Sequence, residues 1–218
     1  MGAAIELVAS DGQRLGAYRA DPPGAARGAV VVLQEIFGVN DHIRAVADGF
    51  AADGYIAVAP AVFDRLRPGV ELGYSADAIS VGVGLRRRTD LDGAMRDIAA
   101  AMPAGKVGVV GYCLGGFLAW LAASRVNGLA CAVSYYGGGI LEHAGERPRC
   151  PVLLHFSDRD DATPVAGIEA LAAAHPDQAV HVYTAEHGFN CDQRGAFDAA
   201  AAQLARERTL AFLRRHIG

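Results

Sequence analysis

The chain alternates short apolar runs with longer amphipathic segments, and this alternation restricts its fold more than any other feature of the sequence. Residues 29–33 and 55–59 form uncharged runs that are typical of strands covered on both faces of a sheet. The segment 41–52 between them has the pattern of a helix. Strands and helices in alternation predict an α/β fold with a mostly parallel central sheet and helices on both faces.

The expected elements follow one another along the whole chain. An antiparallel hairpin is predicted at 5–9 and 14–19, with a Ser-Asp-Gly turn between its strands. Buried strands are predicted at 29–33, 55–59, 106–110, 129–135, 152–156 and 180–183. Helices are predicted at 41–52, 90–102, 114–124, 164–174 and 197–216. Because no repeat or polar linker interrupts this series, residues 1–218 are expected to form a single α/β domain.

Composition and charge exclude several classes of protein. Hydrophobic residues make up 52% of the chain and charged residues 20%, which excludes an intrinsically disordered protein. No uncharged apolar run reaches the length of about 18 residues that a membrane-spanning helix needs. The net charge of −4 argues against nucleic acid as a partner. Since the first ten residues do not resemble a signal peptide, we expect a cytoplasmic protein. We also expect a monomer that acts on a small molecule.

The four cysteines are far apart in the sequence and lack the spacing of a zinc site. No metal or organic cofactor is therefore expected. Cys131 and Cys150 lie at the starts of predicted strands, where a cysteine is usually a small buried apolar residue. Cys113 is different, because it follows a strand and opens a helix.

The segment Gly111-Tyr112-Cys113-Leu114-Gly115-Gly116 has the glycine–x–nucleophile–x–glycine pattern of a nucleophile elbow, with cysteine in the usual serine position. The glycines allow the strand and the helix to approach each other closely around a strained turn. The helix N-terminus also favours the thiolate form of the cysteine. The alternative is an inert cysteine in a glycine-rich turn, and the strand–turn–helix setting argues against it.

Candidate partners for this cysteine follow two later strands. Asp158, Asp160 and Asp161 share one loop, and one of these carboxylates is expected to orient a general base. His187 follows the last strand, so the order nucleophile, acid, histidine is that of an α/β-hydrolase. Taken singly, His187 also fits a solvated loop and the aspartates a helix-capping turn. Their joint order at strand ends favours the catalytic interpretation.

With these residues in place, the sequence resembles the dienelactone hydrolase family of α/β-hydrolases. Besides the turn around Cys113, four further segments match signatures of that family. These are Gln34-Glu35-Ile36-Phe37-Gly38-Val39-Asn40, Asp160-x-x-x-Pro164, Glu186-His187-Gly188-Phe189 and Glu207-Arg208-Thr209-Leu210. Since the similarity runs along essentially the whole chain, it implies an α/β-hydrolase fold with a minimal lid.

The resemblance implies a catalytic triad of Cys113, His187 and Asp160. Asp160 is preferred to its two neighbours by its distance from the proline that follows. In this fold the backbone N–H groups of Ile36 and Leu114 are expected to form the oxyanion hole. Acyl transfer to the Cys113 thiolate would then cleave an ester or lactone.

The resemblance also implies a role for Glu35, which would hold the resting thiol and take its proton when substrate displaces it. A carboxylate beside Cys113 resists formation of the thiolate, because like charges do not readily ionise together. The thiol would therefore stay unreactive, and protected from oxidation, until substrate arrives. The alternative for Glu35 is a surface carboxylate at a strand end, which its apolar neighbours disfavour.

The segments that would bind substrate depart from the family pattern. Family members that open anionic lactones hold the substrate carboxylate with arginines, one of them four residues after the histidine, where this chain has Cys191. Arg194 is a possible substitute one helical turn further. Cys191 is expected at the pocket edge, where a mild oxidant would join it to Cys113. The candidate substrate-binding residues are Phe37, Tyr136, Arg86 and Arg194.

The second arginine cannot be assigned from the sequence. Arg65, Arg67 and the run 86–88 all follow Phe63, and the run also fits a solvated helix face. Tyr136 belongs to a Tyr-Tyr-Gly-Gly-Gly loop that either lines the pocket or packs one tyrosine into the core. The leading hypothesis is a thiol-dependent hydrolase of small, carboxylate-bearing lactones or esters. The alternatives are a broad carboxylesterase and a non-catalytic protein that binds small molecules.

Overall fold

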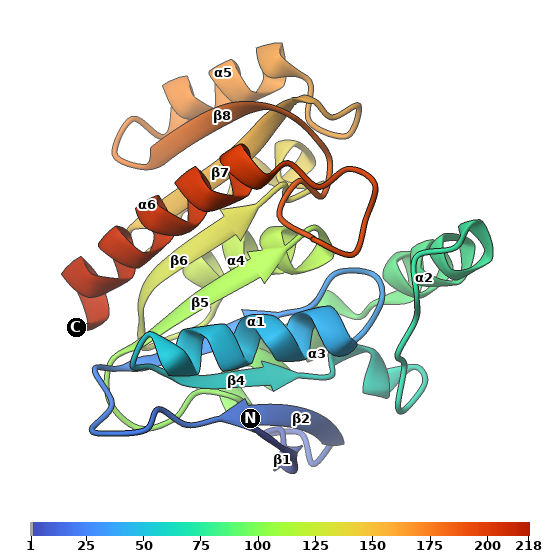
Figure 1. Cartoon of the computed structure of the whole chain (residues 1–218), viewed down its shortest axis with the longest axis vertical. Helices are drawn as coiled ribbons and strands as arrows, with labels where there is room; N and C mark the ends of the chain where they lie inside the picture. Colours follow the sequence, from blue (N-terminus) through green and yellow to red (C-terminus); the bar gives the residue numbers. More distant parts are fainter. Residues whose placement is uncertain (1) are drawn as a thin grey trace.

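A computed structural model describes residues 2–218 of the protein (Figure 1). Its centre is an eight-stranded sheet with the strand order β1-β2-β4-β3-β5-β6-β7-β8. The pairs β1–β2 and β2–β4 are antiparallel, and the six strands from β4 to β8 are parallel to one another. The predicted α/β-hydrolase fold with its mostly parallel sheet is confirmed.

The strands are β1 (Ala3–Val8), β2 (Arg14–Ala20), β3 (Ala29–Leu33), β4 (Ile56–Pro60), β5 (Val107–Tyr112), β6 (Leu129–Tyr135), β7 (Val152–Arg159) and β8 (Ala179–Glu186). The α-helices are α1 (Asp41–Ala52), α2 (Ala76–Arg88), α3 (Leu91–Ala100), α4 (Leu114–Arg125), α5 (Val165–Ala174) and α6 (Ala199–Ile217). Two short 3₁₀ helices, η1 (Val62–Arg65) and η2 (Leu141–His143), complete the regular structure.

The helices cover both faces of the sheet, as Figure 1 shows. Helices α1 and α6 pack on one face, where Phe50 and Leu213 are fully buried. Helices α3, α4 and α5 cover the other face, where Trp120 is fully buried. Burial on both sides explains why β3 and β5 consist almost entirely of apolar residues and glycine. Among residues 2–218, no helix combines the length and apolar character that crossing a bilayer requires.

Most predicted elements are present with shifted ends. The expected ranges 29–33, 41–52 and 129–135 are those observed. Strands β7 and β8 run three residues past their predicted ends, because they continue to pair as far as Arg159 and Glu186 after a bulge. This extension carries the residues that follow, Asp160 and His187, to the same edge of the sheet.

Helix α2 was not predicted, and it projects from the body of the molecule beside the carboxyl ends of the strands (Figure 1). Ser75 caps its N-terminus by accepting a hydrogen bond from the Ala78 N–H. Only Gly82 and Leu85 of this helix are buried. A helix that buries so little of itself has no continuous apolar stripe, so hydrophobic periodicity could not detect it.

Candidate active site

The turn between β5 and α4 presents Cys113 at the carboxyl end of the sheet. Cys113 has φ 54° and ψ −111°, one of two non-glycine residues with positive φ among residues 2–218. A Cβ on Gly111 would lie 1.9 Å from the Gly115 carbonyl oxygen, and one on Gly115 would lie 2.3 Å from that of Leu33. The glycines are therefore required sterically, and the strained turn holds Cys113 in the position that the elbow motif gives to a nucleophile.

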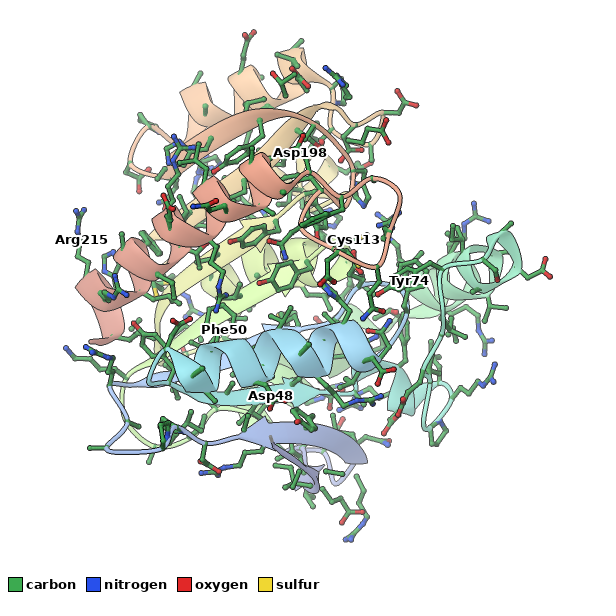
Figure 2. The ribbon with its side chains drawn as sticks, in the orientation of Figure 1. Asp48, Phe50, Tyr74, Cys113, Asp198 and Arg215 are labelled. Atoms are coloured by element: carbon green, nitrogen blue, oxygen red, sulfur yellow. The ribbon has the colours of Figure 1, made fainter. Side chains whose placement is uncertain are left out.

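In Figure 2, Cys113 lies within the outline of the loop that joins β8 to α6. His187, in that loop, has its Nε2 3.1 Å from Cys113 Sγ. The His187 Nδ1–H donates to Asp160 Oδ2 at 2.6 Å, and the Ala162 N–H donates to Asp160 Oδ1 at 2.9 Å. The structure thus brings together the three residues predicted as a triad, each from the end of a different strand.

The structure also separates Asp160 from the other two carboxylates of its loop. Asp160 is buried and bonded to the histidine, whereas Asp158 and Asp161 are exposed. Asp158 accepts a hydrogen bond from the Thr184 hydroxyl instead, at 3.1 Å. The sequence alone did not decide which of the three aspartates orients His187, and the family resemblance indicated Asp160. The contacts in the structure indicate Asp160 independently.

Contacts among Cys113, His187 and Asp160 shift the pKa values of the histidine and the aspartate. Burial alone would lower the pKa of His187, but Cys113 and Asp160 raise it to about 10. Burial would raise the pKa of Asp160, but the hydrogen bond and charge of His187, together with hydrogen bonds from Ala162 and Thr163, lower it. The arrangement therefore favours a protonated imidazole between Cys113 and Asp160.

The two residues predicted to supply the oxyanion donors both adjoin the site of Cys113. Leu114 begins α4 directly after Cys113, so its N–H belongs to the free first turn of that helix. Ile36 lies in the turn after β3 and lines the cavity in front of Cys113. Gly115 packs against the Leu33 and Gln34 carbonyls, which holds the start of α4 against this turn.

Glu35 is not the surface carboxylate of the alternative interpretation, because only 1% of it is exposed. Burial raises its pKa, an effect that Arg194 and His42 oppose. The expected contact with the resting thiol is absent here: neither Glu35 oxygen has a hydrogen-bond partner among residues 2–218. The physical reason is that the thiol faces His187, while the Glu35 carboxylate has the Arg194 guanidinium 3.5 Å away.

A cavity of about 550 Å³ opens in front of Cys113. Its lining residues are Ile36, Phe37, Ile79, Val83, Arg86, Cys113, Gly138, Arg159, Asp160, Asp161, Ala162, Glu186, His187, Arg194 and Ala196. Three of the four candidate substrate-binding residues, Phe37, Arg86 and Arg194, are therefore in place. Tyr136 is not, and that prediction is wrong. Its ring is fully buried and packs edge-on against His187 at 5.1 Å between centroids.

Three arginines reach the cavity from different elements. Arg86, from α2, donates to the Gly138 carbonyl at 2.8 Å, and Arg194 lies over the Phe37 ring at 5.6 Å. Arg159, the last residue of β7, was missed by sequence reasoning, although its position beside Asp160 placed it at the site. Arg65 is excluded, because it pairs with Asp97 and Asp11 away from the cavity.

The remaining cysteines are all free and buried. Burial raises the pKa of Cys131 to about 12 and that of Cys150 to about 11, in keeping with the packing role predicted for both. Cys191 was expected at the pocket edge, and this is wrong. It is fully buried, does not line the cavity, and its thiol donates to the Tyr74 hydroxyl at 3.3 Å.

Comparisons with known proteins agree with this architecture. The model of the dienelactone hydrolase family matches residues 15–217. A carboxymethylenebutenolidase of Pseudomonas putida is 35% identical over 96% of this chain and 94% of its own. Another, from a Pseudomonas species, is 32% identical over 97% and 94%. A solved dienelactone hydrolase-like promiscuous phosphotriesterase from metagenomic libraries superposes with a TM-score of 0.80 over 100% and 99%; at 21% identity it supports the fold.

Proposed function

Because the chain belongs to the dienelactone hydrolase family of lactone and ester hydrolases, we propose that it cleaves small, carboxylate-bearing lactones or esters by acyl transfer to Cys113. The observation that carries this proposal is the pair of hydrogen bonds that connects Asp160 through His187 to the Cys113 sulfur at the cavity. A buried carboxylate, a charged imidazole and a thiol in this order are the parts that nucleophilic catalysis needs.

In the first half of the reaction, the Cys113 thiolate attacks the substrate carbonyl carbon. The carbonyl oxygen becomes an oxyanion and accepts hydrogen bonds from the Leu114 and Ile36 N–H groups. The C–O bond to the alcohol then breaks, and the proton on His187 Nε2 passes to the departing oxygen. A thioester joins the acyl group to Cys113, and in a lactone the alcohol stays attached to that acyl group.

In the second half, the neutral His187 removes a proton from water, and the hydroxide attacks the thioester carbonyl. Cys113 leaves as a thiolate, and the product carries the new carboxyl group. Asp160 keeps the Nδ1 proton of His187 in place throughout, so that Nε2 is the atom that exchanges protons with substrate and water.

Glu35 contributes in two ways under this proposal. Its carboxylate places the Arg194 guanidinium at the cavity wall, where the two groups are 3.5 Å apart. Its raised pKa also suits the proton-accepting role that the family resemblance implies for the resting thiol. A Glu35→Gln variant distinguishes these roles. A changed pH profile of kcat supports proton transfer, whereas a rise in KM alone supports placement of the arginine.

The cavity favours a small acidic substrate. Arg86, Arg159 and Arg194 supply positive charge, while Phe37, Ile79 and Val83 supply apolar surface. Arg86 is bonded to a carbonyl and Arg194 faces Glu35. Arg159, whose side chain is 63% exposed and 3.9 Å from Asp158, is therefore the guanidinium most open to a substrate carboxylate. We expect Arg159→Gln to raise KM for carboxylated substrates and to leave KM for neutral esters unchanged.

Carboxylates on the same cavity wall, Asp161 and Glu186, favour the alternative of a carboxylesterase for neutral substrates. A panel of neutral esters, neutral lactones and carboxylated lactones separates the two, with Cys113→Ala as the control. Preferential cleavage of carboxylated lactones supports the proposal. Preference for neutral esters supports the carboxylesterase, and ligand binding without turnover supports a binding protein. Activity that survives in Cys113→Ala would contradict the mechanism.

A further inference from the structure

Behind the nucleophile, three residues with metal-binding side chains meet in the protein interior. Glu35 comes from the turn after β3, His42 from the first turn of α1, and Cys191 from the loop after β8. One carboxylate oxygen, one imidazole nitrogen and the thiol sulfur all lie within 4.8 Å of one another. All three residues are buried, with at most 4% of any of them exposed.

Two residues of this cluster have buried polar atoms without hydrogen bonds, although the Arg194 guanidinium lies 3.5 Å from one Glu35 oxygen. Both Glu35 oxygens and His42 Nε2 are buried without a hydrogen bond among residues 2–218. Buried polar atoms in folded proteins are nearly always bonded, and an unsatisfied one typically costs about 1–3 kcal/mol. An unsatisfied carboxylate and an unsatisfied imidazole nitrogen on two of its three residues indicate that the cluster is built to hold something that satisfies them together.

Residues around the cluster orient its members as the outer shell of a metal site does. The Asp192 carboxylate lies 3.5 Å from His42 Nδ1, which leaves Nε2 as the nitrogen without a hydrogen bond among residues 2–218. The Tyr74 hydroxyl is bonded to Cys191 Sγ at 3.3 Å, and Tyr74 lies on the α2 side of Cys113 in Figure 2. A carboxylate on the second nitrogen of a histidine is the usual companion of a histidine that binds zinc.

A carboxylate, an imidazole and a thiolate form a donor set that suits zinc, since magnesium and calcium prefer oxygen ligands alone. We propose that Glu35, His42 and Cys191 bind one zinc ion, with water as the fourth ligand. Zinc bonds of about 2.0–2.3 Å require a small inward movement of the three ligand atoms. Binding replaces the thiol proton of Cys191 and releases it to solvent.

The zinc site has a consequence for the cavity, because it uses the carboxylate that faces Arg194. Metal binding separates this ion pair and leaves the Arg194 guanidinium to the substrate cavity. This consequence depends on the proposed function, but zinc binding itself does not. A metal titration without substrate therefore tests the site independently.

The test is a titration of the full-length, metal-free protein with Co²⁺, followed by displacement with Zn²⁺. Cobalt occupies the same kind of site as zinc and, when bound to a thiolate, shows an intense charge-transfer absorption. We expect this absorption to saturate at one equivalent and to disappear on addition of Zn²⁺. It should be absent in Cys191→Ser and in His42→Gln. Asp192→Asn, at an exposed position, should weaken the affinity on the order of tenfold or more.

Two cysteine variants serve as matched controls. Cys113→Ala must retain the absorption, which separates the proposed site from the thiol and imidazole of the triad. Cys150→Ser must retain it as well, because that residue lies in the core on the opposite face of the sheet. Thermal unfolding without metal shows whether each variant is folded. Absence of a thiolate absorption in the native protein, its persistence in Cys191→Ser, or its loss in Cys113→Ala would overturn the proposal.

Discussion

Replacement of Asp160 by asparagine is the sharpest test of the proposed triad, because the two oxygens of Asp160 have separate tasks. Oδ2 accepts from His187 Nδ1 at 2.6 Å, and Oδ1 accepts from the Ala162 N–H at 2.9 Å. Asparagine has only one acceptor oxygen. If that oxygen keeps the Ala162 N–H, the amide NH₂ faces His187 Nδ1 and forces the single imidazole proton onto Nε2, so that Nε2 cannot accept a proton from the Cys113 thiol or from water.

The expected effect is large. A histidine held in the wrong tautomer lowers activity on the order of 10⁴-fold in the serine-protease triad. For Asp160→Asn we expect a fall in kcat/KM on the order of 10²–10⁴-fold, which corresponds to roughly 3–5 kcal/mol of transition-state stabilisation. The variant also removes one of the two anions that raise the pKa of His187. The imidazole should therefore lose its proton at lower pH than in the native protein.

The assay is the pH dependence of kcat/KM on a carboxylated lactone, combined with nitrogen NMR of the His187 ring to identify its tautomer. Asp158→Asn is the matched control, because Asp158 lies in the same loop but bonds Thr184 and does not line the cavity. Its activity should stay within about twofold of the native value. Activity of Asp160→Asn within tenfold of native, or an equal loss in Asp158→Asn, would refute the reasoning.

Three further predictions follow from the same geometry. Gly115→Ala should destabilise the protein by at least about 1–3 kcal/mol in urea unfolding, because the new Cβ meets the Leu33 carbonyl at 2.3 Å; an unchanged midpoint would contradict this. The pKa of His187 is about 10 in the folded protein and about 6.5 in the unfolded chain. The charged imidazole therefore contributes its full stabilisation below about pH 6.5, and this stabilisation is lost as the pH rises through 10. Native protein should therefore lose stability relative to His187→Gln over that interval, and parallel curves would count against the ion pair. Iodoacetamide should label Cys113 well before the buried Cys191, as peptide mass spectrometry can measure; the reverse order would show that Cys191 is accessible.

The sequence predicted the strands and helices of the central sheet and its two faces well, because their hydrophobic patterns lie within short stretches of the chain. Residues 29–33 are buried on both faces and carry an unbroken apolar run, whereas α2 buries only Gly82 and Leu85 and gives no such signal. The turn around Cys113 was predicted for a similar reason. Its glycine spacing is imposed by contacts within a few residues of Cys113 and by two neighbouring strands, β3 and β6.

Side chains that approach from distant parts of the chain were predicted less well. Glu35 was expected on the thiol but faces Arg194, and Tyr136 was expected in the pocket but lies in the core. Arg159 was missed, because the extension of β7 that carries it to the cavity depends on pairing with β8. These outcomes depend on side-chain direction and burial, which neighbouring residues in the sequence do not set.

By itself the sequence determined the α/β architecture, the strained glycine-rich turn around Cys113 and the chain order of the proposed triad, since periodicity, glycine spacing and chain order are properties of the chain. Only the tertiary structure singled out Asp160 by contact, placed three arginines on one cavity, and buried Cys191 beside Glu35 and His42. Those results depend on distances between atoms that packing alone brings together. The spacing of the four cysteines in the sequence predicted no zinc site. Folding nevertheless places Cys191 beside a carboxylate and an imidazole, two side-chain types that bind zinc.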